Sequence, residues 1–154
     1  MRMPVLMKKN LIFQSLILCL IGLSGCEKTN ETGDGQRCRI EAKQGLDDDI
    51  VGTWKLVKGQ TVFYEPKTID YSCDNVIYEF QEGGALVISS NTSEPIGLEA
   101  GNYTYELLNE PFLESEEFTL RLGGLTQGCE ISTDAMTLNS APLDGPILNL
   151  VRIR

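Results

Sequence analysis

Apolar and polar side chains alternate with a period of two along most of the chain that follows residue 49. In the segment 50–58, for example, Trp54 and Leu56 fall on one side, and Thr53 and Lys55 fall on the other. This alternation is typical of a β-strand with one buried and one solvated face. It recurs in eight segments, which are 50–58, 75–81, 85–90, 101–108, 117–122, 128–132, 135–139 and 146–153.

The connections between these segments are mostly short. Glu82-Gly83-Gly84 and Thr133-Asp134 are turn sequences that join neighbouring strands in antiparallel fashion. Eight short antiparallel strands predict an all-β domain, a small eight-stranded antiparallel up-and-down barrel, because closure leaves no exposed sheet edge. A two-sheet sandwich is the competing architecture. We expect little helix after residue 26, because no useful length of helical periodicity follows it.

The longest connection between the predicted strands runs from Gly59 to Asp74. A loop of this length in a compact domain usually has a function or covers something. Phe63 and Tyr64 lie within it and are therefore candidate contacts for a ligand, or part of a lid over the barrel. Residues 61–64 are also a candidate for one further short strand.

The N-terminus carries Lys8 and Lys9, followed by an apolar run over 11–23. That run is too short to cross a bilayer comfortably as a helix. A basic start, a short apolar middle and small residues at its end predict a secretory signal peptide. An uncleaved membrane anchor is the alternative.

The sequence Leu23-Ser24-Gly25-Cys26 resembles the bacterial lipobox. The resemblance implies that Cys26 receives a diacylglyceryl group, that the signal is cut before it, and that its new amine is acylated by a fatty acid such as palmitate. Several acyl chains exceed what stable membrane anchoring needs. Because Glu27 is not the aspartate that retains such proteins at the inner membrane, the resemblance favours the outer membrane, on its periplasmic or surface side. We therefore divide the chain into a signal peptide (1–25), a lipidated cysteine with a flexible tether (26–46) and a barrel domain (47–154).

Cleavage before Cys26 would remove Arg2, Lys8 and Lys9 and no acidic residue, so the net charge would change from −9 to −12. Such a surface repels phosphate backbones and argues against nucleic acid as a partner. At 154 residues the chain has room for one domain, which we expect to be monomeric.

The chain contains no histidine, which excludes Ser-His-Asp and Cys-His catalytic arrangements and histidine-based zinc sites. Acidic residues cluster at 47–49 and 114–117, where calcium is one reading. EF-hand spacing is absent, and a solvated acidic surface is favoured. We expect no catalytic residues, no metal, no cofactor and no enzymatic activity.

Five cysteines divide between the two parts of the chain. Cys19 lies in the signal peptide and Cys26 carries the lipid, which leaves Cys38, Cys73 and Cys129 for an oxidising compartment. In an up-and-down barrel, Cys73 and Cys129 are expected near the same end, whereas Cys38 is expected to approach from the other. The predicted disulfide is therefore Cys73–Cys129, with Cys38–Cys73 as the open alternative.

The segment Gly52-Thr53-Trp54 resembles the first strand of lipocalin-like barrels, and the tail that ends in Arg152 resembles their last strand. Ile77-Tyr78-Glu79-Phe80 and Gly101-Asn102-Tyr103 resemble the small lipocalin-like domains of Bacteroidetes-type lipoproteins. The resemblance implies that Arg152 lies over Trp54 and closes one end of the barrel, as a guanidinium on an indole face can do. The chain lacks the longer strands and the helix of full-length lipocalins. A META-type lipoprotein domain is the alternative family.

These features together predict non-enzymatic binding of a small apolar or amphipathic molecule at the open end of the barrel, beneath the 59–74 connection. The alternative is an envelope interaction module for a protein or glycan. In that case large side chains such as Trp54, Tyr78 and Phe80 fill the barrel and leave no ligand cavity.

Overall fold

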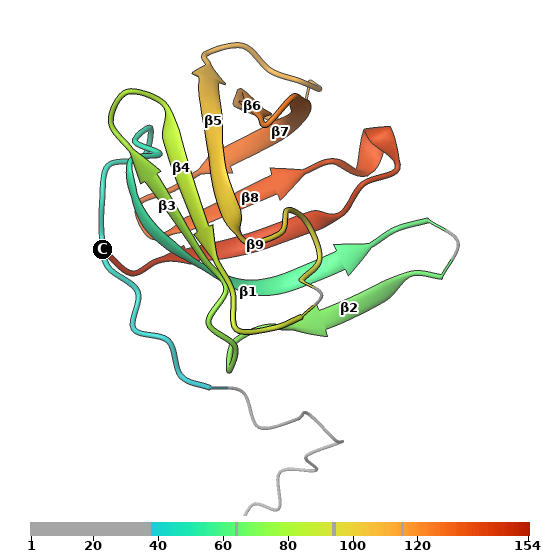
Figure 1. Ribbon diagram of the computed structural model, residues 1–154. Helices are drawn as coiled ribbons and strands as arrows, with labels where there is room; N and C mark the ends of the chain where they lie inside the picture. The colour runs from blue at the N-terminus through green and yellow to red at the C-terminus, as the bar shows by residue number, and fades with distance from the viewer. Residues whose placement is uncertain (1–37, 64, 94, 115) are drawn as a thin grey trace, which may run out of the picture. The chain divides into compact units, whose positions relative to one another are not determined.

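The computed structural model of the chain describes residues 38–63, 65–93, 95–114 and 116–154. The predicted signal peptide, Cys26 and Tyr64 lie outside the described residues. Over the described ranges the fold is all-β, apart from a single 3-10 turn, η1, at Ala141–Leu143 (Figure 1). No helix in these ranges is long and apolar enough to span a membrane.

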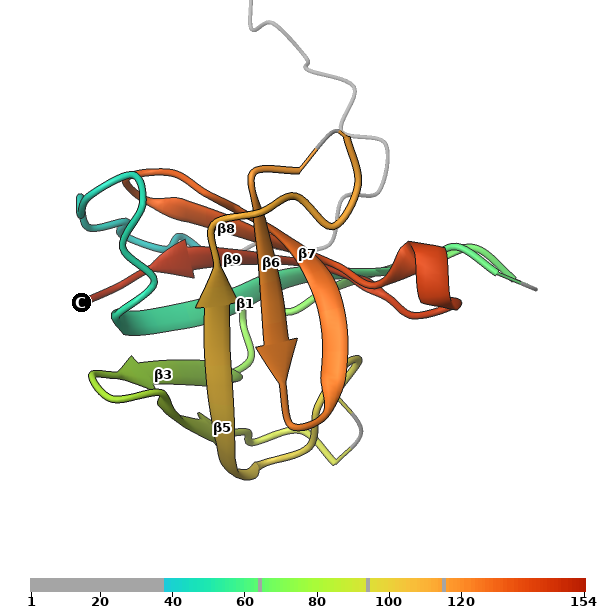
Figure 2. The same cartoon turned by 90° about the horizontal axis from the view of Figure 1, so that it is seen from above.

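Nine strands follow one another along the described chain. They are β1 (Gly52–Thr61), β2 (Lys67–Asp70), β3 (Ile77–Gln81), β4 (Ala85–Ser89), β5 (Gly101–Leu108), β6 (Phe118–Leu122), β7 (Leu125–Ile131), β8 (Ala135–Asn139) and β9 (Ile147–Arg152). Strands β3 to β9 pair antiparallel in order, and β1 pairs with both β3 and β9. The sheet therefore closes on itself, which Figure 2 shows from above, and the predicted eight-stranded up-and-down barrel is confirmed.

Strand β1 pairs with two different strands, β3 and β2, along the same edge. Residues 52–55 pair with β3, and residues 58–61 pair with β2, while β9 runs along the other edge. The long connection that we predicted as a lid is thus largely a β-hairpin, which extends beyond the barrel (Figure 1). The further strand lies later in the connection than predicted, because residues 67–70 form it, whereas Thr61 is the last residue of β1.

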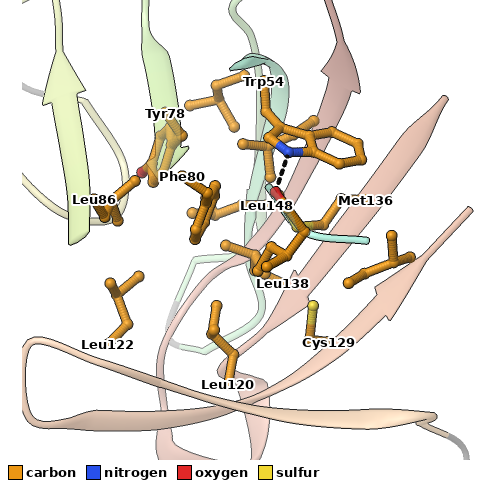
Figure 3. Packing of buried hydrophobic residues seen from close by; sticks show 14 of the residues in the cluster. Trp54, Tyr78, Phe80, Leu86, Leu120, Leu122, Cys129, Met136, Leu138 and Leu148 are labelled. Atoms are coloured by element: carbon orange, nitrogen blue, oxygen red, sulfur yellow. Dashed lines mark hydrogen bonds between the residues drawn. The ribbon is translucent and has the colours of Figure 1, made fainter. Parts of the chain in front are cut away.

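The inward side chains form one hydrophobic core inside the barrel (Figure 3). Trp54, Tyr78 and Phe80 are its largest fully buried members, and Phe80 meets Tyr105 edge to face at 5.0 Å between ring centroids. The strands on the other side of the barrel contribute aliphatic side chains such as Leu138 and Leu148. The alternation read from the sequence thus identifies most of the side chains that point inward.

One end of the barrel is closed by Trp54 and Arg152, as expected. The Arg152 Cζ lies 4.2 Å from the centroid of the indole ring, and the side chains are buried at 0% and 4% exposure. The indole N–H of Trp54 donates to the carbonyl of Ile50 over 2.8 Å (Figure 3). The Arg152 guanidinium donates to the carbonyl oxygens of Val51 and Asp49, which fixes the segment before β1 across this end.

Residues 38–46 were assigned to the flexible tether, but they lie against the barrel. The backbone N–H of Lys43 donates to the carbonyl of Arg152 over 2.8 Å, and that of Gly45 donates to the carbonyl of Thr133 over 2.6 Å. At the start of the segment, the N–H of Cys38 donates to the Ser72 hydroxyl over 3.2 Å. The described segment therefore runs from the β2–β3 connection to the closed end.

The predicted disulfide Cys73–Cys129 is wrong, because the structure has Cys38–Cys73, with Cα atoms 5.0 Å apart. Cys73 is exposed, whereas Cys129 points inward from β7 and is completely buried and free. Cys38 was expected at the closed end of the barrel, but the segment 38–46 begins beside residue 72, next to Cys73 in the chain.

Candidate functional site

An apolar pocket of about 370 Å³ opens at the end of the barrel opposite Trp54 and Arg152. Its walls come from the ends of β1, β6 and β8, the starts of β3, β7 and β9, the 96–98 segment and η1. Ile96, Leu122, Leu138 and Leu148 are among its apolar lining. The volume lies at the lower end of the range for small-molecule sites, and such sites are mostly apolar with a few polar groups.

Phe63 stands in the wall of this pocket, beside Val62, at the end of the β1–β2 hairpin. The two side chains are 45% and 39% exposed, so both keep contact with solvent as well as lining the pocket. Of the two aromatic residues that the sequence analysis selected here, Phe63 therefore reaches the pocket, whereas Tyr64 lies outside the described residues.

Tyr78 reaches the pocket from β3 and is only 1% exposed. Its hydroxyl has no hydrogen-bond partner among the described residues. Burial raises the pKa of Tyr78 to about 12, and the Leu98 backbone, close by but outside hydrogen-bonding geometry, lowers that pKa by less. The phenol is therefore neutral under ordinary conditions.

Gly97 covers that hydroxyl. A Cβ at this position would lie 3.2 Å from the Tyr78 oxygen and 2.9 Å from Cδ1 of Leu148, and the backbone has φ +105°. Both the conformation and the close approach require glycine here. The wall over Tyr78 therefore stays thin and close to the pocket.

Gln127 and Ser140 form a polar contact in the wall of the pocket. The Ser140 hydroxyl donates to Oε1 of Gln127 over 2.5 Å. Gln127 is 6% exposed and has the inward parity of Cys129 and Ile131 in β7. Its Nε2 donates to no described residue, so one end of the amide is held and the other is left without an acceptor.

The described lining of the pocket carries a negative charge and no positive one. No lysine or arginine occurs among the described residues that line it, and the lone ionisable carboxylate there belongs to Asp144, which is exposed. Asp144 ends η1 in the left-handed conformation, with φ 60°. The site consequently offers no cation to a bound anion.

The acidic clusters have different surroundings. Asp47 and Asp48 are exposed, but Glu116 is 7% exposed and accepts hydrogen bonds from the Asn139 amide over 2.7 Å and the Leu113 N–H over 3.1 Å. The predicted solvated acidic surface is therefore wrong for Glu116, which is buried. Within the described ranges, no three side chains of the metal-ligating types gather into a site for an ion.

Gln127 and Ser140 are not among the site residues predicted from the sequence. The predicted strand began at Gly128, which left Gln127 in a connection, whereas β7 begins at Leu125 after the Gly123-Gly124 turn. The signal that could have marked Gln127 was a polar residue with the parity of Cys129.

No family model, no curated protein and no solved structure matches the chain.

Proposed function

We propose that this chain is a lipid-anchored envelope lipoprotein with a lipocalin-like domain, whose barrel binds a small apolar or amphipathic molecule at its open end. The observation that carries the proposal is the apolar pocket of about 370 Å³ opposite the closed end. The proposal includes no catalytic step.

The packing of the barrel supports a site limited to this end. Trp54, Phe80 and Leu86 are buried to 1% exposure or less, so the half of the barrel next to Arg152 is filled by the protein's own side chains. Leu122, Leu138 and Leu148 are held in the same core and offer a preformed apolar surface to the pocket. A ligand that covers this surface gains the free energy of removing it from water.

A pocket-filling variant tests the proposal. Nile red, a neutral dye that fluoresces when it leaves water, should bind the wild-type chain at a single saturable site. Ile96→Trp places a large side chain in the wall of the pocket and should abolish that binding. Val87→Trp is the matched control, because Val87 lies on the outer face of β4, and it should bind the dye like the wild type. Absence of binding, or equal binding by Ile96→Trp, would contradict the proposal and favour an interaction module without a ligand.

The anchor is tested separately in cells. Cys26→Ala should abolish labelling by a fatty-acid probe, whereas Cys19→Ala, which changes a cysteine inside the predicted signal, should leave labelling intact. The labelled wild type should fractionate with the outer membrane. Equal labelling of the Cys26 variant would remove the lipid anchor from the proposal without affecting the pocket.

A further inference from the structure

The amide of Gln127 is the most specific polar feature of the pocket. The Ser140 hydroxyl holds Oε1 over 2.5 Å, and this contact fixes which end of the amide is left to a ligand. The Gln127 side chain is only 6% exposed. The fully buried side-chain atoms without a hydrogen-bond partner are the Tyr78 hydroxyl and Nε of Arg152, and Nε2 of Gln127 is not among them. Nε2 therefore keeps some contact with solvent. Nε2 is therefore an unpartnered donor that a molecule in the pocket can reach.

A buried donor without an acceptor costs free energy, and the cost disappears when a ligand supplies one. A ligand with no polar atom would cover Nε2 and remove its remaining contact with water. A ligand with one acceptor, such as a carbonyl oxygen, would instead satisfy it. The Gln127 amide thus favours molecules that carry an acceptor over molecules of the same shape that carry none.

An anionic acceptor is disfavoured by the surroundings of the same amide. A carboxylate brought into an apolar pocket loses its hydration, and that loss is recovered only where a cation or several donors meet it. The described lining has no lysine or arginine, and the exposed carboxylate of Asp144 stands at the rim. The other polar side chains in the described lining, those of Tyr78, Ser140, Thr61 and Thr126, are neutral hydroxyls.

We infer that the pocket selects a neutral, mainly apolar molecule with one hydrogen-bond acceptor, and that Gln127 Nε2 donates to that acceptor. The inference rests on the proposed function and narrows it, because it excludes fatty-acid anions and other carboxylates as preferred ligands. Gln127 acts as the specificity-determining residue, and Ser140 acts as its positioning residue.

Three ligands with the same bicyclic body test the inference on the wild-type chain. Naphthalene has no acceptor, acetylnaphthalene adds one neutral carbonyl, and naphthoate adds a carboxylate that is ionised at neutral pH. Binding is measured by equilibrium dialysis. Acetylnaphthalene should bind roughly three- to tenfold more tightly than naphthalene, the ratio that one net hydrogen bond supplies. Naphthoate should bind at least about tenfold more weakly than acetylnaphthalene.

Gln127→Leu tests the assignment to one residue, because leucine has a similar shape without a polar group. The variant should bind naphthalene at least as well as the wild type and should lose the preference for acetylnaphthalene. Gln81→Leu, the same change at an exposed glutamine in β3, is the control and should keep the preference. Naphthalene binding itself reports whether the variant pocket is intact.

The outcomes separate the inference from the proposed function. Tightest binding by naphthoate, or an unchanged acetyl preference in Gln127→Leu, would overturn the inference while leaving a binding pocket in place. Failure of all three ligands and of Nile red to bind the wild type would overturn both.

Discussion

The guanidinium of Arg152 lies over the indole of Trp54, 4.2 Å from the ring centroid, and so joins the last strand of the barrel to the first. The two residues are also direct partners in the β1–β9 register. The stacked pair covers the filled end of the core, and Arg152 in turn holds the carbonyls of Val51 and Asp49. The pair is therefore the main closure of this end of the barrel.

Trp54→Ala should lower the free energy of unfolding by about 3–5 kcal/mol, because it leaves a cavity in a fully buried site. Arg152→Met should have a smaller effect, about 1–3 kcal/mol, since it leaves two carbonyl oxygens without a donor. Denaturant titration of both variants measures these values, with Val87→Ala on the outer face of β4 as the control. A neutral Trp54→Ala would contradict the role of the pair.

The Cys38–Cys73 disulfide should stabilise the domain by closing a loop with a sequence separation of 35. The chain-entropy model gives about 4 kcal/mol for a loop of this size. Cys38→Ser should lower the free energy of unfolding toward that value, and reduction of the wild type should have the same effect. Peptide mapping without reduction should recover Cys38 linked to Cys73, and a Cys73–Cys129 peptide would show that the pairing is different.

Stability should fall as the pH rises from about 9 to 12. Burial, followed by the charges of Glu130 and Glu116, raises the pKa of Cys129 from 9.0 to about 12, and burial raises the pKa of Tyr78 from 10.0 to about 12. In this window the unfolded chain has lost protons that the folded chain keeps, so unfolding becomes more favourable. Each group contributes a slope of about 1.4 kcal/mol per pH unit between its two pKa values.

Denaturant titrations across this pH range measure the effect. Cys129→Ala should remove the part of the slope that begins near pH 9, and Tyr78→Phe should remove the part that begins near pH 10. A stability that stays flat to pH 12 in the wild type would show that neither group is shielded from water as the structure indicates.

Glu116 should stabilise the β5–β6 connection on the outer face of the barrel. Its carboxylate accepts from the Asn139 side chain and the Leu113 backbone, and it packs against Gly128, where a Cβ would collide with it. Glu116→Ala should lower the free energy of unfolding by about 1–3 kcal/mol. Glu114→Ala changes an exposed acid in the same connection and should be close to neutral. Equal effects of the two changes would rule out a specific role.

The barrel could be predicted from the sequence because each strand has its own period-two pattern. The contact between Trp54 and Arg152 could also be predicted, from parity and resemblance together, since both residues lie at the ends of strands that close the barrel. In contrast, the pattern does not show how far a strand extends past the barrel. Strand β1 continues through Gly59 to Thr61 and pairs there with β2, whose four residues are mostly exposed.

The candidate site was only partly predictable for a similar reason. Phe63 could be selected, because an apolar residue in a long connection is conspicuous. Gln127 shares the parity of Cys129, but the strand was predicted to begin at Gly128, because the pattern does not show that the tight turn at Gly123-Gly124 lets β7 begin at Leu125. The disulfide depended on the path of residues 38–46, which have no periodic pattern and are held by backbone hydrogen bonds to Arg152 and Thr133.

Amide chemical shifts during a titration with acetylnaphthalene test most directly whether the open end of the barrel is a binding site. We predict saturable shifts at Gly97, Leu125 and Gln127, which line the pocket, and none at Gly52 and Thr53 near the closed end. Shifts confined to the closed end or to the outer surface, or no shifts at the highest soluble concentration, would contradict the account.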